Sequence, residues 1–225
     1  MEHRSIAIDG PSGAGKSTLA KGLAQALGFL YVDTGAIYRT LGLYALRREV
    51  APTDREGVLG LLDSVQIELR HGADGIQRMY LGGEDVSEEI RRHEISSYAS
   101  HISALPEVRA FLMETQRRLA AEHDVVMDGR DIGTVVLPDA DVKIFLTAEP
   151  AARSHRRYEE LRQRGQETDY ETVLRDLTQR DFDDTNRAAA PLRQAADAVL
   201  ADTTALSLDE SLELLKKTVE ERLSR

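Results

Sequence analysis

The chain has 225 residues, a net charge of −10 at pH 7 and no cysteine. The lack of cysteine excludes disulfides, thiolate metal sites and cysteine nucleophiles, and the acidic charge argues against nucleic acid as the main partner. No apolar run approaches the roughly 18 residues of a membrane span, and the N-terminus lacks a signal-peptide pattern. We therefore expect a cytoplasmic protein with no nucleic-acid or membrane partner.

Short apolar runs alternate with helical patterns along the chain. The periodicity of Leu19, Leu23 and Leu27 predicts the first helix, which Gly28 ends. Strands that alternate with helices are typical of a parallel sheet covered on both faces. The pattern predicts a three-layer α/β fold with a central sheet of about five strands, at residues 5–9, 29–32, 124–127, 142–146 and 198–201.

One stretch interrupts this alternation. Residues 65–69 alternate apolar and polar side chains, residues 71–75 are typical of a turn, and residues 77–86 resume the strand pattern. This pattern predicts an antiparallel hairpin. We assign it to a small inserted lobe at residues 59–92, so that residues 1–58 and 93–225 form the core. Residues 208–223 read as an amphipathic packing helix.

The first strand is followed by a phosphate-binding loop. Residues 10–17 match the pattern G-x-x-x-x-G-K-[ST], with a strand before and a helix after. Backbone N–H groups of such a loop surround phosphate oxygens, the lysine reaches the terminal phosphates and the hydroxyl holds Mg²⁺. We expect ATP to be bound by Gly10, Pro11, Ser12, Gly13, Ala14, Gly15, Lys16, Ser17 and Thr18.

Several classes of protein carry this loop. GTPase switches also need an Asn-Lys-x-Asp motif, but Asn186, the one asparagine of the chain, precedes Arg187. Large ATPases need a longer chain. A small kinase remains, and it needs a second, anion-binding site for the acceptor.

Two segments at strand ends are candidates for that acceptor site. Residues 33–39 (DTGAIYR) follow the second strand and residues 128–131 (DGRD) follow the third. Ligands of parallel α/β sheets bind beyond the carboxyl ends of strands. Asp128 could hold the hydration shell of Mg²⁺. For each segment, a structural loop ion pair remains the alternative.

Two charged helical segments are further candidates. Arg153, Arg156 and Arg157 would share one helix face, where a transferred phosphoryl group would relieve their mutual repulsion. A solvated face neutralised by neighbouring glutamates is the alternative. Arg180, Asp184 and Arg187 form a stripe of alternating charge, which could equally be a self-neutralising surface.

Together these segments resemble the bacterial cytidylate kinases, members of the nucleoside monophosphate kinase family. The resemblance covers nearly the whole chain in the expected order: the phosphate-binding loop, DTGAIYR, GGEDVSEEIR, YASHISALPEVR, DGRDIGTVV and RDFDDTNRAAAPL. The loop and an arginine lid are common to all such kinases. The combination of GAIYR, DGRD and R-D-x-x-D-x-N-R is more specific.

The resemblance implies a role for each candidate residue. Thr34, where some relatives have serine, would face the cytosine ring with Arg109, Asp131 and Arg187. The pentose would contact Ser100, Arg180 and Asp184, and the acceptor phosphate would contact Arg39 and Arg130. A mobile helical lid at about 150–168 would carry Arg153, Arg156 and Arg157, which would act in catalysis with Lys16 and Arg130. Mg²⁺ would be held by Ser17 and, through water, by Asp128.

The implied activity is phosphoryl transfer from ATP to CMP or dCMP by a monomeric enzyme. Two alternatives stay open. A P-loop kinase for another monophosphate or a small metabolite would not need Arg109, Asp131 and the Arg180 stripe together. A nucleotide sensor without turnover would not need Lys16, Ser17 and the lid arginines.

Overall fold

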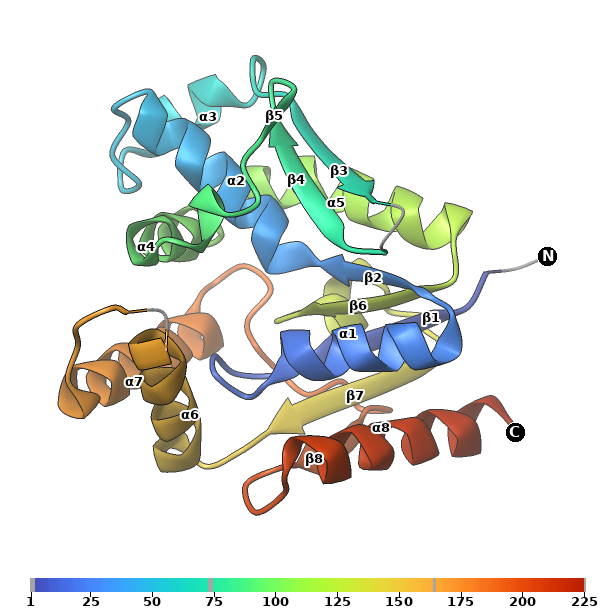
Figure 1. The fold of residues 1–225 in the computed structure, drawn as a ribbon. Helices are drawn as coiled ribbons and strands as arrows, with labels where there is room; N and C mark the ends of the chain where they lie inside the picture. The colour runs from blue at the N-terminus through green and yellow to red at the C-terminus, as the bar shows by residue number, and fades with distance from the viewer. Residues whose placement is uncertain (1–2, 73–74, 164, 225) are drawn as a thin grey trace.

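Five parallel strands form the centre of the molecule (Figure 1). In this computed structural model, which describes residues 3–72, 75–163 and 165–224, the strand order is β2-β6-β1-β7-β8. Their bounds are β1 Ser5–Asp9, β2 Leu30–Asp33, β6 Val125–Gly129, β7 Val142–Thr147 and β8 Val199–Asp202. The predicted parallel sheet is confirmed, and the observed strand ends lie within two residues of the expected ones.

Helices cover both faces of this sheet because successive strand residues point to opposite sides. Ile6 and Ile8 of β1 pack beneath α1 (Lys16–Leu27) and α8 (Leu208–Leu223). Ala7 belongs instead to the core on the opposite face, where α5 (Pro106–Glu122) and a π-helical turn (Ile132–Val136) pack. The helix predicted at residues 208–223 is confirmed. It begins at a capping box, in which the Ser207 side chain accepts from Glu210 N and the Glu210 carboxylate accepts from Ser207 N.

A second, antiparallel sheet lies above β2 in Figure 1. Its strands are β3 Ile67–His71, β4 Gln77–Leu81 and β5 Glu84–Asp85, in the order β3-β4-β5. The predicted hairpin is confirmed, although His71 belongs to a strand rather than to the turn, and residues 73 and 74 of the expected turn lie outside the described residues. The helices of this half are α2 Thr34–Arg47, α3 Arg55–Leu61, the 3₁₀ turn Glu89–Arg91 and α4 His93–Ile102.

The small sheet shares one hydrophobic cluster with α2, α4 and α5. Met79 of β4 packs with Ile37 and Leu41 of α2 and with Ile95 of α4. Residues outside 59–92 therefore belong to the same packed unit. The bounds expected for the inserted lobe remain a prediction.

Helices α6 (Pro150–Gln163) and α7 (Tyr170–Asn186) form an arm beside the carboxyl end of β7 (Figure 1). Leu161, Val173 and Leu177 pack between the two helices. The expected helical segment near residues 150–168 is present as α6, although residue 164 lies outside the described part; its action as a lid remains a prediction. Across the described residues, no helix has the length and apolar character to cross a membrane.

Gly10, the residue after β1, lies very close to the backbone of β7, and this contact predicts the effect of a substitution. A Cβ added at Gly10 would lie 2.0 Å from the carbonyl oxygen of Leu146 in β7. We expect Gly10→Ala to lower the free energy of unfolding by about 3 kcal/mol because the backbone itself must shift. Urea unfolding followed by circular dichroism would measure this change.

Gly60 of α3 provides the matched control, since a Cβ there meets nothing within 4 Å. Gly60→Ala should raise the free energy of unfolding by up to about 1 kcal/mol through helix propensity. Equal stability of the Gly10→Ala variant and the unmodified protein would contradict the proposed clash.

Candidate functional site

The phosphate-binding loop connects β1 to α1. Gly13 and Gly15 have φ of 74° and 85°, in the left-handed region that favours glycine, and Gly15 is the residue before α1 begins. Lys16 is buried, and its Nζ donates to the Pro11 carbonyl at 2.7 Å. The loop thus has the backbone geometry of an anion cradle at a helix N-terminus.

The end of β6 brings Asp128 beside this loop. The Ser17 hydroxyl donates to Asp128 Oδ2 at 3.0 Å, and the Tyr31 hydroxyl donates to Asp128 Oδ1 at 2.9 Å. Among the described residues, no group of three or more His, Cys, Asp or Glu side chains is arranged to bind a metal ion. A Mg²⁺ ion here would need ligands from Ser17, water and nucleotide phosphates, which is the ligand set that Mg²⁺ ordinarily uses with nucleotides. The residues present fit that requirement.

Burial and neighbouring charges shift two ionisable groups at the loop. Burial, and secondly the charge of Arg130, lowers the pKa of Lys16 to about 7, against the opposing effect of Asp128. Burial, and secondly the charge of Asp33, raises the pKa of Asp128 to about 6, against the opposing effect of Lys16. In both groups burial disfavours the charged form, and the opposite charge of the other group favours it.

Just beyond the carboxyl end of β6, a buried cluster brings Asp131 between two arginines. Arg109 of α5 donates to Asp131, and Arg187 Nη2 lies 3.7 Å from Asp131 Oδ1. Arg187 also lies 3.6 Å from Asp184, whose second oxygen accepts from Arg130 Nε at 2.7 Å. The fold thus brings together residues that lie far apart in the sequence.

The arginines of this region retain unsatisfied donors. Buried nitrogens that have no hydrogen-bond partner within the described residues are Arg39 Nε, Arg109 Nε, Arg180 Nε and Arg187 Nη2. Each such nitrogen carries the free-energy cost of lost hydration, of the order of 1–3 kcal/mol. A ligand with acceptor oxygens or nitrogens would remove that cost.

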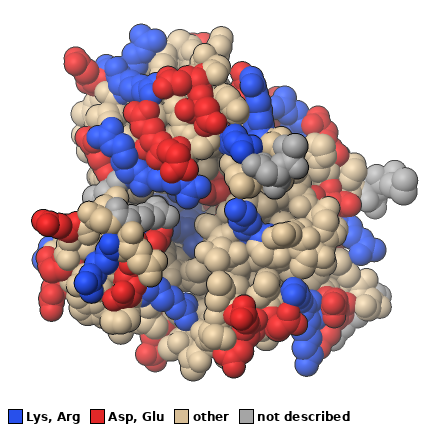
Figure 2. Space-filling view, in the orientation of Figure 1, with Lys and Arg blue, Asp and Glu red and all other residues tan. Residues whose placement is uncertain are grey.

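Arg180 lies within electrostatic reach of four other cations; we call this group of five the arginine hollow, and it consists of Arg180, Lys16, Arg39, Arg130 and Arg157. Burial, and secondly the charge of Arg130, lowers the pKa of Arg180 to about 10. Figure 2 shows Lys and Arg atoms inside the hollow that separates the α6–α7 arm from the half that carries the small sheet. Arg39, Arg130 and Arg157 each pair with a carboxylate, but Arg39 Nε and Arg180 Nε have no hydrogen-bond partner among the described residues, which favours an anionic ligand.

The three expected lid arginines have three different environments. Arg153 is buried, and it donates to the carbonyls of Ala148 and Ser12 at 2.8 and 2.7 Å and pairs with Asp181 at 2.7 Å. Arg156 donates to the Thr203 carbonyl at 2.6 Å, beyond the end of β8. Arg157 pairs with Glu160 at 2.8 Å and also faces Arg180 electrostatically. Arg157 therefore reaches the arginine hollow, while Arg153 fixes the root of the arm to the phosphate-binding loop.

Thr34 and Ser100 differ in how they relate to the cluster. The Thr34 hydroxyl donates to the Asp128 carbonyl at 2.7 Å, so its oxygen can only accept from a ligand. Ser100 lies on α4, and no side-chain hydrogen bond joins it to other described residues; its carbonyl accepts from Ser103, whose own carbonyl accepts from Arg109. Thr34 thus lies beside Asp128, whereas Ser100 is linked to Arg109 only through the backbone of Ser103.

Sequence reasoning missed several residues that organise the site. Asp9 accepts from the N–H groups of Ile132 and Gly133 at 2.7 Å each, and burial, opposed by these bonds, raises its pKa to about 6. The Tyr38 ring lies beneath the Arg109 guanidinium, 5.6 Å from the ring centre. The position of Asp9 at the end of a strand could have marked it as a site residue. Tyr31, which donates to Asp128, has no local sequence pattern that would mark it.

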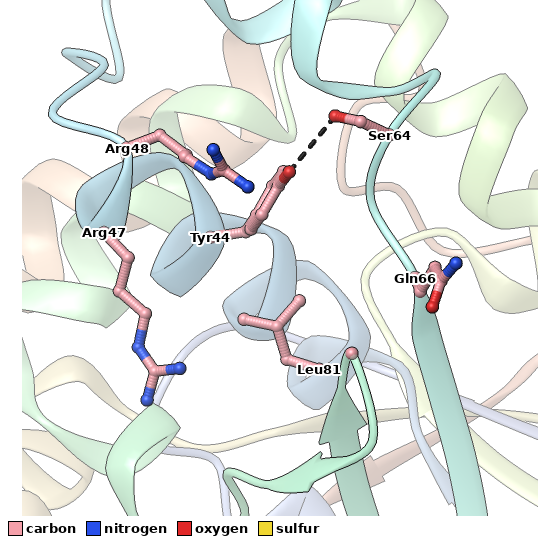
Figure 3. Close-up of a pocket in the computed structure, with 7 residues that line it drawn as sticks. Tyr44, Arg47, Arg48, Ser64, Gln66 and Leu81 are labelled. Carbon is pink, nitrogen blue, oxygen red and sulfur yellow. Dashed lines mark hydrogen bonds between the residues drawn. The ribbon is translucent and has the colours of Figure 1, made fainter.

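A separate hollow lies between the end of α2 and the small sheet (Figure 3). Arg47 at its edge pairs with Glu84 and Glu89, and Arg48 lies 5.0 Å from the centre of the Tyr44 ring. None of the buried unsatisfied nitrogens or oxygens of the described residues lies in this hollow. It is distinct from the arginine hollow.

The phosphate-binding loop, the parallel sheet and the arginine hollow define a P-loop kinase. The family model for cytidylate kinase matches residues 6–221. The chain therefore belongs to the cytidylate kinase family, as its motifs indicated.

Relatives agree with this assignment, and a solved structure shares the fold. The chain is 52% identical to a cytidylate kinase of Desulfitobacterium hafniense (strain Y51), with coverage of 91% of this chain and 88% of the relative. It is 44% identical to one from Streptococcus pneumoniae (strain Hungary19A-6), with coverage of 99% and 100%. A crystal structure of an uncharacterised protein from Eubacterium ventriosum, 13% identical, has a TM-score of 0.51 with coverage of 99% and 100%, which shows the shared fold alone.

The pKa of Lys16 predicts proton uptake on nucleotide binding. At about pH 8 the amine, with a pKa of about 7 in the free protein, is mostly uncharged. Triphosphate oxygens favour the charged form, so the pKa rises and binding takes up close to one proton. Isothermal titration calorimetry of ATP in two buffers with different ionisation enthalpies would measure this uptake. The Asp128 carboxyl, with a pKa of about 6, is already ionised at that pH.

Lys16→Arg is the control, because a guanidinium remains protonated throughout this pH range. Its binding enthalpy should not depend on the buffer. Uptake that is equal in the two proteins would assign the proton to another group.

Proposed function

We propose that the protein transfers the γ-phosphate of ATP to CMP or dCMP, giving ADP and CDP or dCDP. The observation that carries this proposal is the buried cluster of Arg109, Asp131 and Arg187 beside the arginine hollow. A kinase needs the hollow for two phosphate groups, but only an acceptor with a polar ring needs a buried carboxylate flanked by two arginines.

The polarity of the cluster suits cytosine. An ionised carboxylate accepts hydrogen bonds and does not donate them, so Asp131 suits the exocyclic amine of cytosine. Thr34, whose hydrogen is used by the Asp128 carbonyl, also offers an acceptor. The spare donors Arg109 Nε and Arg187 Nη2 suit the ring nitrogen and carbonyl of the same base.

In the proposed reaction, an oxygen of the acceptor phosphate attacks the γ-phosphorus of ATP. A bond forms between these atoms while the bond from the γ-phosphorus to the bridging oxygen breaks, and ADP leaves. Arg39 and Arg130 hold the acceptor phosphate, while Lys16 and Arg157 stabilise charge on the transferred group. Arg180 and Asp184 hold the pentose, with Ser100 as a further expected contact.

We further propose Mg²⁺ as the cofactor, held by the Ser17 hydroxyl and, through water, by Asp128. When bound, the ion would supply positive charge to the β- and γ-phosphates. Residence in the cytoplasm and a monomeric state remain predictions from the sequence.

The proposed activity is tested by a substrate panel. Coupled ADP release would be measured with CMP, dCMP, UMP, AMP and shikimate as acceptors. We expect CMP and dCMP to be used well, and Lys16→Ala to reduce kcat by about 100-fold or more through lost charge stabilisation. Shikimate as the best acceptor would support the metabolite kinase, and ATP binding without turnover of any acceptor would support the sensor.

Base choice gives a sharper prediction. Uracil has a carbonyl where cytosine has its amine, so it would place an acceptor against Asp131. We expect kcat/KM for CMP to exceed that for UMP by about 30- to 1000-fold. Asp131→Asn can donate from its amide, so the ratio should fall toward one in that variant.

Asp139 supplies the control for this measurement, because it is exposed in the loop before β7. Asp139→Asn should leave the ratio unchanged. If Asp131→Asn reduces both kcat/KM values by the same factor, Asp131 does not read the base.

A further inference from the structure

The outer edge of β2 is closed by side chains of the small sheet. β2 is an edge strand of the central sheet, so its outward N–H and C=O groups need partners. Gln77 Oε1 accepts from Asp33 N at 2.8 Å, and Gln77 Nε2 donates to Asp33 O at 3.3 Å. His71 Nε2 donates to Tyr31 O at 2.8 Å. Gln77 and His71 together take the place of a neighbouring strand.

The side chains of Gln77 and His71 reach β2 from neighbouring positions on the two strands of the hairpin. His71, the last residue of β3, is the register partner of Gln77, the first residue of β4, and paired residues of antiparallel strands project to the same side. Figure 1 shows this end of the small sheet beside β2. The two sheets are therefore joined here by side chains rather than by a backbone ladder.

Asp33 connects Gln77 to the arginine hollow, because its main chain binds Gln77 and its side chain binds Arg39. Its Oδ1 accepts from Ala36 N at 2.9 Å and caps α2, while its Oδ2 accepts from Arg39 Nη2 at 2.9 Å. A Cβ on Gly35 would lie 2.9 Å from Arg39 Nη1, so the glycine leaves room for the guanidinium against the first turn of α2. The Arg39 Nε has no hydrogen-bond partner within the described chain. The Arg39 guanidinium is thus bound by the side chain of Asp33, the residue whose main chain Gln77 holds.

We propose that Gln77 is a positioning residue for the acceptor phosphate: by fixing Asp33, it sets the orientation of Arg39. This inference rests on the proposed function, in which Arg39 holds that phosphate. It gives the small sheet a role in acceptor affinity. Gln77 itself need not touch the substrate.

The test uses Gln77→Met, which retains the length of the side chain and removes the amide, with its two hydrogen bonds to Asp33 and its contact with Met79 Sδ. We expect KM and Kd for CMP to rise about 3- to 10-fold, as for the loss of one or two neutral hydrogen bonds. KM for ATP and kcat should stay within about twofold, since the triphosphate loop is untouched. Cytidine lacks the phosphate, so its Kd should not change; a general loss of structure would weaken cytidine and CMP alike.

Gln66→Met is the matched control, because Gln66 is an exposed glutamine of the same half whose side chain lies in the separate hollow of Figure 3. It should leave every constant unchanged. Melting temperatures of both variants would establish that they are folded.

A double-mutant cycle with Arg39→Met completes the test. Arg39→Met should weaken CMP binding about 10- to 100-fold, and adding Gln77→Met should weaken it no further, because Gln77 acts through Arg39. Additive effects, an unchanged CMP affinity in Gln77→Met, or an equal loss for cytidine would each overturn the inference. An unchanged CMP affinity in Arg39→Met would instead refute the phosphate role of Arg39, and the inference with it.

Discussion

Buried arginines need anions, and this requirement organises the site. Asp131 and Asp184 neutralise Arg109, Arg130 and Arg187, but two carboxylates cannot satisfy every donor of three guanidinium groups. The folded protein carries the cost of the remaining donors until a ligand arrives. Part of the binding free energy of a nucleotide is therefore stored in the empty protein as unsatisfied polar groups.

Carboxylates at the ends of parallel strands set this arrangement. β1 ends at Asp9, β2 ends at Asp33, and Asp128 lies next to the end of β6, so the parallel sheet brings all three to one edge. Each has a different partner: Asp9 holds the turn after Asp131, Asp33 holds Arg39, and Asp128 holds Ser17 and Tyr31. The central sheet thereby fixes the relative positions of the phosphate-binding loop, Arg39 and the turn after Asp131.

The sequence predicted those parts of the protein in which the signal is local. The phosphate-binding loop and helix α8 could be recognised from adjacent residues alone, and the charge pattern at Arg180, Asp184 and Arg187 indicated one helix face. The partners of Arg153 could not be predicted, because Ser12 lies 141 residues away and the contact depends on how α6 leaves the sheet. The link from Gln77 to Asp33 was missed for the same reason, since it depends on the register of the hairpin against an edge strand.

The position of Arg153 has a consequence for how the α6–α7 arm can change during evolution. Arg153 lies in the first turn of α6 and holds the Ser12 carbonyl, so the root of the arm is anchored to the triphosphate loop. At the start of α7, its first residue Tyr170 donates to the Ala151 carbonyl at 3.5 Å and packs edge-on against the rings of His155 and Tyr158. A substitution of Arg153 would therefore disturb the phosphate-binding loop as well as the arm, so two parts of the protein constrain this one position.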